Sequence, residues 1–76
     1  MFVIRNRKTG KFVYGTDYRY HPPHQRTSSD SALTFSNLFS AEFEFRQRRM
    51  SHSRYEICKA EIKLIEVIPW KTVKKN

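Results

Sequence analysis

The chain has 76 residues, of which 15 are Lys or Arg and seven are Asp or Glu, so its formal net charge is +8. This length allows one domain with a small core, and a single cysteine excludes an intrachain disulfide. So large a positive charge favours nucleic acid or an acidic protein surface as a partner. No apolar run approaches the roughly 20 residues that span a bilayer, and the first residues lack the pattern of a signal peptide, so we expect a cytoplasmic protein.

A β-hairpin is the first element that the chain predicts. Two short apolar runs, at about Phe2–Asn6 and residues 11–14, favour strands, and the Asn, Thr and Gly between them favour a tight turn. Gly10 suits the positive-φ position of that turn. The hairpin also concentrates four cations: Arg5, Arg7, Lys8 and Lys11.

The next segment, residues 15–31, holds few aliphatic residues and two consecutive prolines, so we expect a long loop. A loop of this length in a compact domain is usually functional or mobile, and this one carries Tyr18, Arg19 and Tyr20. The β-favouring run at residues 32–35 predicts a short third strand or an extended approach to a helix.

A helix is predicted over residues 41–50. Ser40 and Asn37 are both of the type that caps a helix N-terminus, and we favour Ser40. With that start, acidic side chains lie in the first turn and arginines in the last turns, which is the order that the helix dipole favours. Two neighbouring apolar stripes are expected to face the sheet, one with Phe39, Phe43 and Met50 and one with Ala41 and Phe45.

The strongest β pattern lies in residues 54–70. Between Cys58 and Leu64, apolar and charged residues alternate, which predicts a long strand. We expect the rest of the chain to cover its apolar face, which carries Cys58 and Ala60. Pro69 ends the ladder because it has no N–H to donate.

These elements together predict an α+β fold with a small antiparallel sheet and one helix packed on one face. The sheet consists of the N-terminal hairpin and the long C-terminal strand, with residues 32–35 as a third strand or as an extended approach to the helix. We expect a single domain over residues 1–70, with its long loop at about residues 15–31, followed by a basic tail at residues 71–76.

The chain carries no catalytic motif, neither a nucleophile elbow nor a Gly-rich phosphate loop, so we expect a binding protein rather than an enzyme. His21 and His24 have a ligand-like spacing, with Cys58 as a conceivable third ligand. A structural zinc site needs a second close pair of ligands, which is missing here. We therefore expect solvated histidines, no metal and no cofactor.

The basic residues form the only broad constellation. Arginine binds phosphate bidentately, and tyrosine offers a stacking face to an unpaired base, so this mixture suits single-stranded or structured RNA better than duplex DNA. Such charges form a binding surface only if the fold gathers them on one side. The candidate nucleic-acid-binding residues are Arg5, Arg7, Lys8, Lys11, Tyr18, Arg19, Tyr20, Arg46, Arg48, Arg49 and Arg54. The alternative is a module that binds an acidic protein surface.

Residues 2–13, Phe-Val-Ile-Arg-Asn-Arg-Lys-Thr-Gly-Lys-Phe-Val, resemble the start of many small proteins of T4-like tailed phages. In those proteins a loop, a segment like residues 32–35, a short helix and a strand like residues 55–62 follow. The resemblance extends to about residue 68, and it assigns no functional site to any residue of this chain. It implies a small non-enzymatic phage protein, made early in infection, that acts in the host cytoplasm on a host or phage component. Roles known among such proteins include blocking toxin–antitoxin or restriction defences and altering tRNA, transcription or RNA decay.

Overall fold

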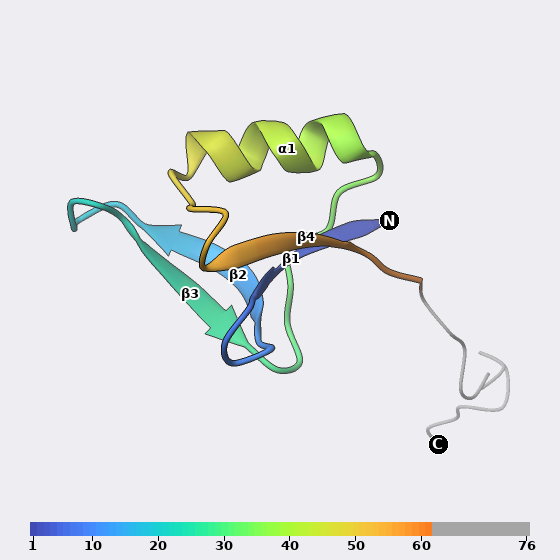
Figure 1. Cartoon of the computed structure of the whole chain (residues 1–76), viewed down its shortest axis with the longest axis horizontal. Coiled ribbons are helices and arrows are strands. Elements are labelled where there is room, and N and C mark those ends of the chain that lie inside the picture. Colours follow the sequence, from blue (N-terminus) through green and yellow to red (C-terminus); the bar gives the residue numbers. More distant parts are fainter. Residues whose placement is uncertain (62–76) are drawn as a thin grey trace, which may run out of the picture.

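A computed structural model describes residues 1–61 of the chain as a four-stranded antiparallel sheet with one helix on one face (Figure 1). The elements are β1 (Phe2–Asn6), β2 (Phe12–Asp17), β3 (His24–Ser28), α1 (Leu38–Gln47) and β4 (Tyr55–Lys59). The strand order is β3-β2-β1-β4, so β1 and β2 form the centre of the sheet. The α+β architecture predicted from the sequence is confirmed.

The β1–β2 hairpin forms as predicted because its turn is locally satisfied. Gly10 has a φ of 76° and donates its N–H to the Asn6 carbonyl at 2.9 Å. The Asn6 side-chain oxygen accepts the backbone N–H groups of Lys8 at 2.8 Å and Thr9 at 3.0 Å. These bonds satisfy the backbone of the turn without using its basic side chains.

The loop expected at residues 15–31 is wrong where strands replace it, because residues 15–17 belong to β2 and residues 24–28 form β3. β2 continues to Asp17 and pairs with β3, with a register shift between Val13 and Gly15. β3 has no hydrophobic pattern, since its sequence is His-Gln-Arg-Thr-Ser, and it forms because the edge of β2 offers unpaired backbone groups.

Of the two alternatives for residues 32–35, a third strand and an extended approach to the helix, the structure shows the second, with one isolated bridge. Phe35 exchanges two backbone hydrogen bonds with Phe2, at 2.8 and 2.9 Å, and Leu33 donates its N–H to the Val13 carbonyl at 3.0 Å. The connecting segment thereby supplies backbone partners to β1 and β2 at the open end of their hairpin.

Helix α1 begins three residues earlier than predicted. Asn37, and not Ser40, is the N-cap, and its side chain accepts the Ser40 N–H at 2.8 Å. The earlier start leaves the first turn without an acidic residue, while Arg46 still lies in the last turn. Within the described residues, no helix is long and apolar enough to cross a membrane.

The core lies between α1 and the sheet. It is formed by the buried side chains of Ile4, Val13, Phe45 and Met50, against which Leu33, Phe35, Tyr55 and Ile57 pack. The predicted stripe with Phe39 and Phe43 does not face the sheet, because these side chains are 73% and 48% exposed. A helix packed on a sheet buries only one of its own faces, and Ala41 and Phe45 lie on that face of α1.

β4 lies beside β1 with Ile57 opposite Ile4 and Cys58 opposite Val3. Since opposite residues share a face, Ile57 faces the helix and Cys58 lies on the other side of the sheet. The helix therefore covers the face that carries Ile57. On the face that carries Cys58, Val3 is 5% exposed and the Cys58 side chain is half-buried. The later part of the predicted strand, from Ile62, and the basic tail lie outside the described residues.

Candidate nucleic-acid interface

Two hollows adjoin each other at one end of the sheet. The turn hollow encloses about 550 Å³ and is lined by Asn6, Arg7, Lys8, Thr9, Ser53 and Arg54. The proline hollow also encloses about 550 Å³ and is lined by Pro22, Pro23, His24, Gln25, Arg49, Ser51, Arg54 and Tyr55. Arg54 lines both, and none of the described residues that line either hollow is acidic.

The topology brings together the lysine and arginine side chains that line the two hollows, although they are distant in sequence. β1 ends at the turn where β4 begins, and the Arg7 N–H donates to the Arg54 carbonyl at 2.8 Å. α1 runs back over the sheet, so its C-terminus arrives at the same end (Figure 1). We call Arg7, Lys8, Arg49 and Arg54 the basic end.

Arg49 owes its position to the way the helix ends. Its φ is 57°, and it follows the C-cap residue Arg48. The Arg49 N–H donates to the Arg46 carbonyl at 3.0 Å, and the Met50 N–H donates to the Phe45 carbonyl at 3.2 Å. This is the Schellman pattern, in which glycine is the usual residue at the left-handed position. Here an arginine occupies that position and lines the proline hollow.

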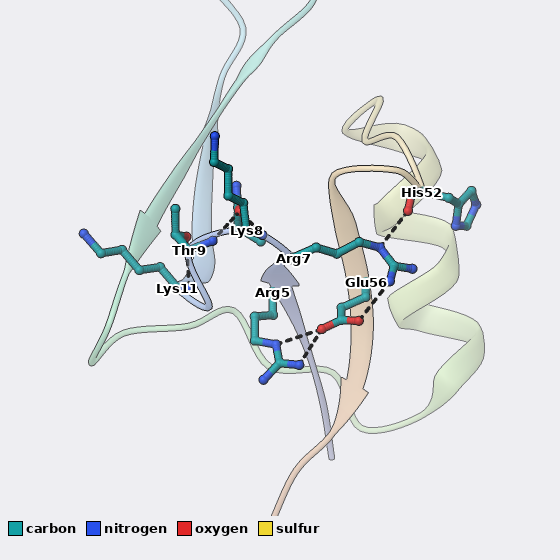
Figure 2. Close-up of polar contacts among 8 residues, drawn as sticks. Arg5, Arg7, Lys8, Thr9, Lys11, His52 and Glu56 are labelled. Atoms are coloured by element: carbon teal, nitrogen blue, oxygen red, sulfur yellow. Dashed lines mark hydrogen bonds and ion pairs between the residues drawn. The ribbon is translucent and has the colours of Figure 1, made fainter.

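Glu56 holds two of the predicted site residues. Arg5 donates to its carboxylate from Nε at 2.9 Å and from Nη2, and Arg7 donates from Nη1 at 3.3 Å (Figure 2). Arg7 also donates from Nε to the His52 carbonyl at 2.8 Å. The hydrogen bond from Arg5 lowers the pKa of the Glu56 carboxyl and raises the pKa of the Arg5 guanidinium. Both arginines are therefore ion-paired with Glu56, and Arg7, whose contact is the longer of the two, also lines the turn hollow.

The two lysines of the hairpin behave differently from these arginines. Lys8 and Lys11 extend away from Glu56, as Figure 2 shows. Both are exposed, and neither side chain has an ion pair within residues 1–61. Only Lys8 lines the turn hollow, so the structure brings Lys8 but not Lys11 into the basic end.

Two further predicted site residues are already paired with carboxylates. Arg48 donates from Nε to Glu44 at 2.9 Å and from Nη1 to the Thr16 hydroxyl at 2.9 Å, and its side chain is 21% exposed. Arg19 binds Asp17 through Nη2 at 2.6 Å. The side-chain hydrogen bond from Arg19 is the main reason that the pKa of Asp17 is lowered.

The remaining predicted residues lie outside the basic end. Tyr18 is 56% exposed at the tip of the β2–β3 hairpin. Tyr20 stacks on His24, with ring centroids 3.8 Å apart and an interplanar angle of 4°, and so borders the proline hollow indirectly. Arg46 lines a smaller hollow of about 220 Å³ beside Glu42 and His52.

The structure adds side chains that sequence reasoning did not select. His24 and Tyr55 line the proline hollow, and they come from β3 and β4 on opposite edges of the sheet. The Gln25 amide donates to the Arg48 carbonyl at 2.8 Å, which ties β3 to the helix end.

The arrangement offers guanidinium and ammonium donors beside flat ring surfaces, which can bind phosphate and stack on a base. Within residues 1–61, no three His, Cys, Asp or Glu side chains gather in a way that could hold a metal ion. Comparisons with protein-family models, with curated proteins and with solved structures find no match for this chain, so its interpretation depends on this geometry.

Proposed function

We propose that this protein is a non-enzymatic accessory protein that binds RNA at the basic end. The observation that supports the proposal is the pair of adjoining hollows, joined at Arg54 and lined by cations without an acidic neighbour in the lining. Phosphates bound there would meet Arg7 and Lys8 in the turn hollow, Arg49 in the proline hollow and Arg54 in both. The net charge of +8 adds long-range attraction for any polyanion.

The proposal predicts a definite salt dependence. Each cation that neutralises a phosphate releases a counterion, so the slope of log affinity against log salt is about −0.7 per contact for a single strand. Four contacts at the basic end give a slope of about −3. Binding through diffuse charge alone would instead respond equally to any lysine or arginine that is lost.

A matched pair of charge reversals tests the location. Lys8 lies in the turn hollow, and Lys59 is an exposed lysine at the opposite end of β4, paired with Phe2. Lys8→Glu and Lys59→Glu change the net charge equally. We expect Lys8→Glu to weaken the binding of a labelled RNA at low salt much more than Lys59→Glu, measured by fluorescence anisotropy. Equal losses from both variants, or no RNA binding by the unaltered protein, would contradict the proposal.

The source and role that we propose follow from the hairpin resemblance: a phage protein, made early in infection and acting in the host cytoplasm. Crosslinking of the protein to RNA in infected cells, followed by sequencing of the bound RNA, tests this role. Recovery of defined host or phage transcripts would support it. Recovery of RNA in proportion to its abundance would argue against a directed role.

The alternative function, inhibition of a host defence protein, has one observation in its favour. Leu38, Phe39 and Phe43 form an exposed apolar patch on α1, and they are 46%, 73% and 48% exposed. Contiguous exposed apolar side chains of this kind mark many protein-binding surfaces. Phe39→Ser combined with Phe43→Ser should abolish binding to a purified toxin–antitoxin or restriction component, after nuclease treatment, and leave RNA binding intact. An inhibitor that binds through the basic end would show the reverse.

A further inference from the structure

The proline hollow has the size and lining of a site for one nucleotide. Its volume of about 550 Å³ lies in the range of small-molecule pockets, which is about 300–1,000 Å³. Ring surfaces line it at Pro22, His24 and Tyr55, and guanidinium groups line it at Arg49 and Arg54. The turn hollow, beyond Arg54, has no aromatic side chain in its lining and offers Arg7 and Lys8 to phosphate.

The ring of His24 is held in place before any ligand arrives. It stacks on Tyr20 with a centroid distance of 3.8 Å and an interplanar angle of 4°. The β3 backbone that carries it is paired with β2, with His24 opposite Asp17. The neighbouring residue, Gln25, is tied to Thr16 at 2.6 Å and to the Arg48 carbonyl. A base that stacks on His24 therefore costs little side-chain entropy, because the His24 ring is already ordered.

The two hollows differ in the part of a nucleotide that each suits. Rings beside cations suit a base with its own phosphate, whereas cations without rings suit the next phosphate along a chain. Arg54, which lines both hollows, is placed to bind the phosphate between them. Bases of a duplex are stacked and paired, so their faces do not reach a hollow of this kind.

We propose that the proline hollow receives one unpaired base of single-stranded RNA, with the flanking phosphates at Arg54 and in the turn hollow. This inference rests on the proposed function and specifies its substrate class. Single-stranded RNA binds more tightly than duplex RNA of the same sequence, and the difference depends on His24.

Two histidines of the same hairpin provide matched variants. His24 lines the hollow, whereas His21, which is also exposed, does not. With a labelled single-stranded RNA of about ten nucleotides, His24→Ala should weaken binding about 5- to 150-fold, the usual range for loss of one stacked base. His21→Ala should bind like the unaltered protein, and neither variant should change the affinity for the duplex. Thermal unfolding of His24→Ala establishes that the comparison concerns folded protein.

A measurement on the unaltered protein supplies the second test. Titration with cytidine 5′-monophosphate should shift the NMR signals of the His24 ring through the ring current of the base and leave those of His21 unchanged. Inorganic phosphate should not produce the same shift. If phosphate and the nucleotide act alike, or if single strand and duplex bind equally and His24→Ala changes nothing, the nucleotide site is refuted while RNA binding by the basic end stands. If the protein binds no RNA at low salt, both proposals fail.

Discussion

Replacing Arg49 by glycine should stabilise the fold and weaken RNA binding at the same time. Arg49 has a φ of 57°, a conformation that costs an L-residue about 1–2 kcal/mol and costs glycine almost nothing. Glycine also makes the unfolded chain more flexible, which offsets about 0.4–1 kcal/mol of the gain. The net expectation is a rise in unfolding free energy of about 0.5–1 kcal/mol, or roughly 2–8 °C in melting temperature for a chain of this size.

Alanine at the same position separates backbone from charge. Arg49→Ala and Arg49→Gly both remove the guanidinium, but only glycine removes the Cβ that the left-handed conformation penalises. Thermal unfolding followed by circular dichroism should give the higher melting temperature for Arg49→Gly. In RNA titrations at several salt concentrations, both variants should lower the magnitude of the log–log slope by about 0.7, the value for one lost phosphate contact. Equal melting temperatures for the two variants would refute the strain argument, and unchanged slopes would remove Arg49 from the interface.

Two further predictions concern Glu56 and the core. Hydrogen bonding to Arg5 lowers the pKa of Glu56 from its ordinary value of 4.5, so its contribution to stability is complete above that value and is lost as the pH falls through the lower folded-state pKa. Glu56→Gln should therefore be less stable than the unaltered protein at neutral pH, with a gap in melting temperature that closes in acid, whereas a gap independent of pH would contradict this reasoning. Phe45→Ala should cost about 3–5 kcal/mol because Phe45 is buried against the sheet, and Phe39→Ala should change the unfolding free energy by less than about 0.5 kcal/mol because Phe39 is largely exposed. Urea unfolding measures both, and a larger loss from Phe39→Ala than from Phe45→Ala would show that the helix packs through its other face.

Elements whose signal is local were predictable. β1 has the predicted bounds, and Gly10 adopts the expected positive φ, because strand propensity and turn chemistry act within a few residues. The helix was predicted, but its start was misplaced because Asn37 and Ser40 are equally suitable caps three residues apart. Which of the two is used depends on where the preceding segment is fixed, and Phe35 fixes it by pairing with Phe2.

Elements defined by a neighbour were not predictable. β3 is polar and carries no periodic pattern, and it is held by its pairing with the edge of β2, including the Thr16–Gln25 hydrogen bond and the Asp17–Arg26 ion pair. The alternation in β4 was visible, but the face that packs on the helix is set by its register with β1, which places Ile57 opposite Ile4. A register of this kind depends on contacts about 50 residues apart, so the chain pattern alone did not fix it.

The candidate site divides in the same way. The composition determined the excess of cations, and the order of residues determined their two groups, one at the hairpin and one around the helix end. The spacing of four residues between Glu44 and Arg48 on a helix also favours their ion pair. Only the tertiary structure decided that Arg5 is held by Glu56, and that Arg7, Lys8, Arg49 and Arg54 share one end of the sheet. The physical reason is that the number of charges belongs to the sequence, whereas the distance between charges, and with it the field that a ligand meets, belongs to the fold.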